Sequence, residues 1–154
     1  MNNPPPTIGQ NIDKMNLFGF DTEIIDMGGQ KYFRDLWDSQ FVDISGLVFV
    51  IDGSNDSKFE EAGQELTRIL QFDELKDIPI LISVNKSDLP NCRGINEIAE
   101  AIAMTPQTQR SSQFFTWVRV SALIGDGVSE AFSKLMGAIR QHQDQVRHSG
   151  GQRQ

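Results

Sequence analysis

The sequence predicts an α/β domain with a mostly parallel β-sheet, on the basis of two observations. Three unbroken apolar runs have the composition of strands that are buried on both faces of a parallel sheet; they are residues 46–52, 78–85 and 115–121. Apolar residues at helical spacing follow each run. Strands that alternate with helices need crossover connections, so we expect the three strands to be parallel.

The chain before these runs predicts a loop and then a β-hairpin. Residues 1–6 include three consecutive prolines, which cannot enter a helix interior or donate to a strand ladder, so this segment is expected to be a loop. Residues 11–25 contain two extended stretches that break at Phe18-Gly19, where glycine can take the positive φ of a hairpin turn. Residues 31–41 predict a short irregular helix.

Three amphipathic helices are expected after the three buried strands, one after each. Their apolar faces consist of Phe59, Ala62, Leu66, Ile69 and Leu70, of Ile95, Ile98, Ala99 and Ile102, and of Val128, Ala131, Phe132, Leu135, Met136 and Ile139. Polar residues from Gln141 onward lead into residues 147–154, which we expect to form a disordered tail.

Composition limits the possible classes of protein. The chain has 154 residues, of which 38% are hydrophobic and 23% charged, as expected for one globular domain. Its net charge of −7 argues against a sequence-independent nucleic-acid binder, which needs clustered positive charge. The single cysteine excludes an internal disulfide and fits a reducing compartment. The sequence shows no signal peptide, transmembrane run or myristoylation motif, so we expect a cytoplasmic protein with no membrane anchor in these residues.

Polar residues at the end of the predicted hairpin are suited to a metal and a phosphate. Asp26 can hold Mg²⁺ through water, because this ion gives up its hydration shell reluctantly. Gly29 has no side chain, so its N–H can approach a terminal phosphate closely. Gln30 comes next and can orient a water molecule for in-line attack.

The later strands end in residues that are suited to a guanine base. The Asp88 carboxylate can accept hydrogen bonds from the N1–H and 2-amino groups of guanine, a donor pair that adenine lacks. We expect Asn85 to brace the loop and the base edge, and the stem of Lys86 to lie over a purine face. After the last strand, at Ser121-Ala122, the backbone N–H of Ala122 can reach a base carbonyl. Each motif alone is common, but their order, with each at a strand end, indicates a nucleotide site.

From Pro6 to about Ile139 the sequence resembles small GTPases of the ADP-ribosylation-factor (Arf and Arf-like) family. Four segments carry the resemblance: residues 6–9 resemble switch I, residues 26–30 (DMGGQ) match the DxGGQ of switch II, residues 85–91 (NKSDLPN) resemble the NKxDLPN base loop, and residues 121–127 resemble the last loop with its Gly-Asp-Gly. The glycine pair before Gln30 and the Leu-Pro after the base loop favour Arf-like over Ras-like or Rab-like proteins.

The resemblance implies a three-layer sandwich of the P-loop NTPase type over residues 7–146. It also implies a guanine-nucleotide switch that uses GTP, GDP and Mg²⁺, in which Thr7 ligates the metal and contacts the γ-phosphate and Gln30 is the catalytic residue. The implied partners are effectors, exchange factors and GTPase-activating proteins that bind the switch regions. The implied role is vesicle or membrane traffic, with the complete protein peripheral on the Golgi or other endomembranes.

The sequence departs from the family in one respect, because it contains no GxxxxGK[ST] loop. We therefore expect the fold to lack the family's first strand, P-loop and first helix. The two strands that flank the missing one should then present unpaired edges or pair with each other. Binding of GTP and Mg²⁺ by this chain alone is expected to be weak or absent, and the chain alone to be inactive as an enzyme. Three interpretations remain open: an incomplete Arf-like GTPase, a P-loop-less pseudoGTPase that binds proteins without nucleotide, and an unrelated α/β domain.

Overall fold

The computed structural model describes residues 4–103 and 113–150. The chain divides into two compact units, Met1–Asp43 and Ile44–Gln154, each of which is described by itself. Residues 1–3 of the expected N-terminal loop and residues 151–154 of the expected tail lie outside the described residues.

The first unit begins with the predicted hairpin. Strands β1 (Gln10–Leu17) and β2 (Phe20–Met27) pair antiparallel along their full length. The turn consists of Phe18 at φ 51° and Gly19 at φ 88°, and two consecutive left-handed residues match the twist of the flanking strands. The side chain of Asn16 accepts a hydrogen bond from the Gly19 N–H at 3.1 Å, which further stabilises the turn.

Two 3₁₀ helices follow the hairpin, η1 (Lys31–Leu36) and η2 (Asp38–Gln40). They correspond to the predicted short irregular helix. Trp37 lies between them, and its indole N–H donates to the backbone oxygen of Gly28 at 3.1 Å. This bond fixes the helical segment to the glycine pair that precedes it.

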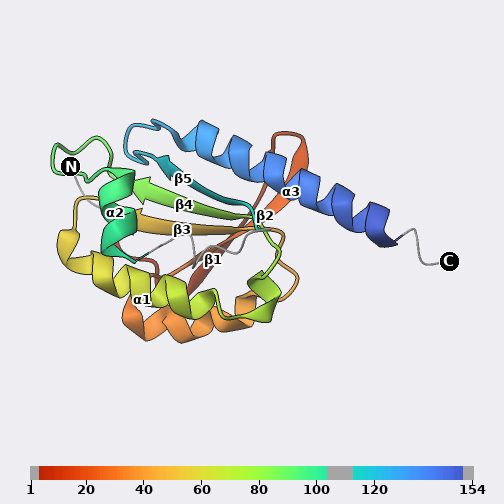
Figure 1. The fold of residues 1–154 in the computed structure, drawn as a ribbon. Coiled ribbons are helices and arrows are strands. Elements are labelled where there is room, and N and C mark those ends of the chain that lie inside the picture. Colours follow the sequence, from red (N-terminus) through yellow and green to blue (C-terminus); the bar gives the residue numbers. More distant parts are fainter. Residues whose placement is uncertain (1–3, 104–112, 151–154) are drawn as a thin grey trace. The chain divides into compact units, whose positions relative to one another are not determined.

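The second unit is a parallel sheet with helices on both faces (Figure 1). Its strands are β3 (Leu47–Asp52), β4 (Ile80–Asn85) and β5 (Phe115–Arg119), in the order β3-β4-β5. Its helices are η3 (Asp56–Lys58), α1 (Phe59–Ile69), η4 (Asp73–Leu75), α2 (Ile95–Ala101) and α3 (Val128–Gly150). The predicted parallel strands and the three amphipathic helices are therefore confirmed.

The core of the second unit is centred on β4, whose residues 80–84 are all buried. Helix α3 covers one face of the sheet and α1 lies on the other (Figure 1). On the α3 side, a buried cluster consists of Leu81, Val118, Val120, Ala131 and Leu135. Because the sheet is covered on both faces, its strands are nearly continuous apolar runs, which is why the sequence revealed them.

The strands form two separate sheets. In the described part of the chain β2 pairs only with β1, and β3 pairs only with β4.

Helix α3 is longer than the sequence predicted. It continues to Gly150 and so includes residues 147–150, which were expected to belong to a disordered tail. The physical reason is local: no glycine or proline interrupts residues 138–149, and the polar residues that fill the last turns are compatible with a helix. No helix in the described ranges is both long and apolar enough to cross a membrane.

Candidate functional site

The two predicted metal ligands lie together in the first unit. The Thr7 hydroxyl donates to the Asp26 carboxylate at 3.1 Å, and the Asn11 side chain donates to the same oxygen at 3.5 Å. Thr7 precedes β1, and Asp26 lies near the end of β2, so the hairpin brings the two residues together. A hydroxyl and a carboxylate are oxygen donors of the kind that Mg²⁺ takes together with phosphate and water.

Gly28 allows the two switch-like segments to approach each other. Its N–H donates to the backbone oxygen of Gly9 at 2.8 Å. A Cβ at this position would lie only 2.5 Å from the backbone oxygen of Thr7, so a larger residue would force the segments apart. The sequence analysis predicted a role for Gly29 and none for Gly28. The Gly-Gly pair was the sequence feature that could have indicated both positions.

Gly29 and Gln30 are both exposed. Around Gly29 the space is open, with no atom within 4 Å of an added Cβ. Its backbone oxygen accepts a hydrogen bond from Arg34 Nε at 3.1 Å. Gln30 precedes η1, and its backbone oxygen accepts the Phe33 N–H at 2.8 Å. The backbone is thus held in place by η1 and the exposed side chain of Gln30 lies at its start.

Four of the predicted base-binding residues form two pairs in the second unit. Asn85 Oδ1 accepts the backbone N–H of Ala122 at 3.0 Å. The fully buried Ser121 donates its hydroxyl to Asp88 Oδ1 at 2.5 Å, while Asp88 itself is exposed. The loops after β4 and β5 are therefore joined by two hydrogen bonds. The Ala122 N–H, which was expected to reach a base carbonyl, is directed to Asn85 in this structure.

Lys86 forms an ion pair that the sequence did not predict. Its Nζ lies 2.7 Å from Asp52 Oδ2 at the end of β3. Asp52 also accepts the Ser54 N–H at 3.0 Å and the Ser54 hydroxyl at 2.7 Å. Burial raises the pKa of the Asp52 carboxyl, but the hydrogen bonds from Lys86 and Ser54 outweigh it and hold this pKa below its ordinary value. The sequence could have indicated a role for Asp52, because this residue ends a buried strand and the next strand leads into the base loop.

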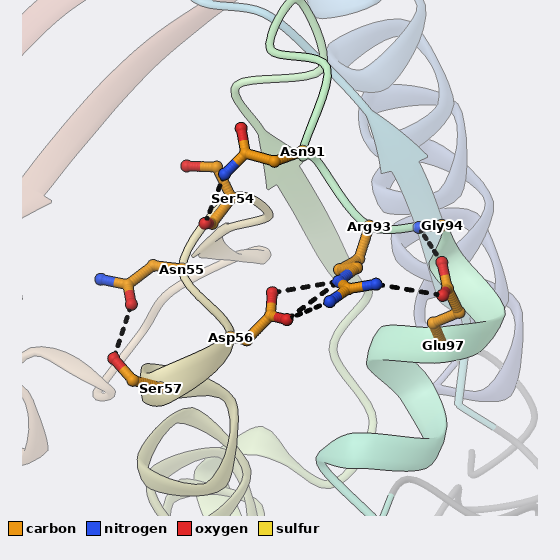
Figure 2. A network of polar contacts seen from close by, with 8 residues as sticks. All are labelled: Ser54, Asn55, Asp56, Ser57, Asn91, Arg93, Gly94 and Glu97. Atoms are coloured by element: carbon orange, nitrogen blue, oxygen red, sulfur yellow. Dashed lines mark hydrogen bonds and ion pairs between the residues drawn. The ribbon is translucent and has the colours of Figure 1, made fainter.

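A second polar network holds the far end of the base loop (Figure 2). Arg93 donates from Nε to both carboxylate oxygens of Asp56, at 3.1 and 2.9 Å, and lies 3.7 Å from Glu97. The hydrogen bonds from Arg93 lower the pKa of the Asp56 carboxyl and raise that of the arginine. The Asn91 side chain donates to the backbone oxygen of Ser54 at 3.1 Å. The segment after β3 thus contacts both the start of the base loop, at Lys86, and its end.

The parallel sheet with helices on both faces and the loops at its strand ends are features of an α/β nucleotide-binding fold. The model of the ADP-ribosylation factor family matches residues 1–139 of the chain. Because this match covers most of the sequence, the chain belongs to the ADP-ribosylation factor family.

A solved structure supports the same fold. The Arl6 BBS3 small GTPase from Trypanosoma brucei, solved with the bound nucleotide analogue GppNp, superposes with a TM-score of 0.84. The two sequences are 24% identical, and the match covers 92% of this chain and 86% of that one. The predicted family and fold class are therefore confirmed, and the interpretation as an unrelated α/β domain is wrong.

Proposed function

We propose that the chain is a guanine-nucleotide-dependent switch that recognises the base through Asp88. The hydrogen bond from Ser121 to Asp88 is the observation that carries this proposal. It orients the exposed carboxylate, whose oxygens can then accept the N1–H and 2-amino groups of guanine. Adenine offers no such pair of donors, so binding it would leave the carboxylate without these hydrogen bonds.

Thr7 and Asp26 fit the role of a magnesium site beside the terminal phosphate. Their oxygens are in hydrogen-bond contact, and both residues lie in the segments that resemble the switches. In the described residues no group of three or more His, Cys, Asp or Glu could hold a metal. In the proposed site, phosphate and water are the further ligands of the Mg²⁺. A bound Mg²⁺ would neutralise part of the negative charge on the phosphates.

We propose Gln30 as the residue that orients the attacking water during GTP hydrolysis. Its exposed side chain follows Gly29, whose N–H is proposed to bind the γ-phosphate. In-line attack places the water on the far side of that phosphate from the leaving oxygen, so a side-chain amide adjacent to the γ-phosphate site is suitably placed.

The contacts between Thr7 and Asp26 and between Gly9 and Gly28 couple the two switch-like segments. Loss of the γ-phosphate would remove a ligand that both segments share and release them together. Effectors, exchange factors and GTPase-activating proteins are the proposed readers of this change. The proposed setting is cytoplasmic, with a role in vesicle or membrane traffic at the Golgi or other endomembranes.

A second candidate is a protein-binding module that works without nucleotide. The sequence favours it in one respect, since it contains no GxxxxGK[ST] loop to surround the α- and β-phosphates. Large apolar side chains near the switches are also exposed, Ile8 to 82% and Tyr32 to 87%. Such side chains are available for partner contacts in either candidate.

Nuclear magnetic resonance titration of the ¹⁵N-labelled chain separates the two candidates. The chain is titrated with GDP and, in parallel, with ADP, to about 10 mM, so that affinities in the millimolar range are still measured. If the chain is a guanine-nucleotide switch, GDP should shift the amide signals of Ala122 and of the base loop, and ADP should leave these signals unchanged. Equal shifts with both nucleotides contradict base recognition, and the absence of shifts with either nucleotide favours the protein-binding module.

A further inference from the structure

We propose that Asp52 is a positioning residue for guanine recognition: its carboxylate holds the Lys86 ammonium, so that the methylene chain of Lys86 is fixed as one wall of the base site. This inference rests on the proposed function and extends it to a residue outside the base loop.

The backbone at Lys86 is held in a strained conformation. Its φ is 67°, in the left-handed region that side chains with a Cβ seldom adopt. Three hydrogen bonds maintain it: Gly53 N–H to Asn85 O at 3.0 Å, Ser87 N–H to Val120 O at 3.0 Å, and Leu89 N–H to Lys86 O at 3.0 Å. The direction in which the Lys86 side chain leaves the loop is therefore fixed.

The ion pair fixes the other end of the same side chain. A lysine side chain has four rotatable carbon–carbon bonds, and holding it in one conformation costs rotamer entropy. The Lys86 side chain is 47% exposed, so packing alone does not immobilise it. The contact with Asp52 at 2.7 Å supplies the missing constraint. With both ends fixed, the methylene groups between them form a defined apolar surface in the same loop that carries Asn85 and Asp88.

Asp52 is itself held in place. Both the backbone N–H and the hydroxyl of Ser54 donate to its Oδ1, which leaves Oδ2 for the ammonium. The carboxylate therefore has a fixed orientation before Lys86 binds to it. An acceptor that is already oriented loses little entropy when it forms the ion pair.

The neighbouring Asp56–Arg93 pair provides a matched control. Asp56 lies four residues after Asp52 and its carboxylate also binds a cation, but its partner Arg93 lies outside the base loop, two residues after the loop ends. Asp52→Asn and Asp56→Asn each remove one negative charge from the same segment. Any general effect of charge on the binding of an anionic nucleotide is therefore the same in the two variants.

The experiment measures GDP affinity by titration of the full ¹⁵N-labelled chain. We expect Asp52→Asn to weaken GDP binding about threefold to fivefold, the size typical of a half-exposed ion pair, and Asp56→Asn to leave it unchanged. Lys86→Met keeps an apolar stem but cannot form the ion pair, so it should match Asp52→Asn. In the Lys86→Met background, Asp52→Asn should cause no further loss, because Asp52 acts through Lys86.

Four results would overturn the inference. Equal affinities for the Asp52→Asn and Asp56→Asn variants, or additive losses in the double variant, exclude positioning through Lys86 while the proposed function still holds. An unaltered chain that binds GDP and ADP equally overturns the proposed function and the inference with it. If the Asp52→Asn variant fails to fold, side-chain spectra of the unaltered chain test the inference instead. GDP should shift the Lys86 methylene signals, and unshifted signals would exclude Lys86 as a wall of the base site.

Discussion

Thr7 and Asp26 lie 19 positions apart in the sequence, and their side chains are joined by a hydrogen bond of 3.1 Å. The β1–β2 hairpin produces this contact, since it returns the chain beside its own start. The same return brings the Gly28 N–H onto the backbone oxygen of Gly9. The two segments that would sense the γ-phosphate are therefore a single structural feature of the first unit, and this feature can be tested by substitution.

Gly28→Ala should destabilise the first unit. The added methyl group would lie 2.5 Å from the backbone oxygen of Thr7, and overpacking of this kind costs about 1–3 kcal/mol. Gly29→Ala is the matched control, because no atom lies within 4 Å of its added Cβ. Hydrogen exchange of the hairpin amides measures the effect. Equal protection in the two variants would show that the segments can separate without cost.

Asp88→Asn should change the preference of the chain from guanine to xanthine. The 2-oxo group of xanthine can accept from an amide, whereas a carboxylate cannot donate to it. A charged hydrogen bond contributes about 1.5–3 kcal/mol, so the ratio of GDP to XDP affinities should change by at least about tenfold. The titration is repeated with XDP, with Asp56→Asn as the control. A variant that keeps the original preference would exclude Asp88 as the residue that reads the base.

Ser121→Ala should weaken GDP binding and lower the free energy of unfolding by about 1 kcal/mol, the typical net value of one hydrogen bond. The buried hydroxyl is lost, and with it the bond that orients Asp88. Urea denaturation measures the stability and the GDP titration the affinity. Ser129→Ala, at an exposed position on α3, serves as the control. Unchanged GDP affinity would show that the Asp88 carboxylate needs no orientation by Ser121.

Gln30→Leu should slow GTP hydrolysis by at least about tenfold and leave GTP binding close to normal, because only the orientation of water is lost. The assay uses the chain joined to a strand–GxxxxGK[ST]–helix segment of the family, so that the phosphates are held, and follows phosphate release in a single turnover. Gln64→Leu, on the exposed side of α1, is the control. Equal rates for the two variants would remove Gln30 from the mechanism.

The Asp52–Lys86 ion pair should make the stability of the chain depend on pH below about 4, near the pKa of an unperturbed aspartate. The folded-state pKa of Asp52 is lowered, so its contribution is fully present above the unfolded pKa and is lost as the pH falls through the folded one. For a half-exposed pair this contribution is less than about 1 kcal/mol. The stability difference between the unaltered chain and Asp52→Asn should be equal at pH 7 and pH 5. A difference that already shrinks between these pH values would contradict the assignment to Asp52.

The sequence by itself determined the type and order of the elements. The strands of the second unit were visible because a parallel sheet covered on both faces needs continuous apolar runs, and the three helices because each buries one apolar stripe. The hairpin turn was visible because Gly19 takes a conformation that other residues avoid. The candidate base residues were visible as well, since Asn85 and Asp88 follow directly at the end of a buried strand, where parallel sheets bind their ligands.

Only the tertiary structure decided which of these residues touch each other. The pairing of Ser121 with Asp88 and of Lys86 with Asp52 depends on how the ends of three strands come together at one edge of the sheet, and local pattern carries no such information. The sequence also did not show that the strands form two sheets. The residue pattern of a strand is the same whether one or both of its edges are paired. Periodicity reports which face of an element is buried, whereas partners are chosen by contacts between residues that are far apart in the chain.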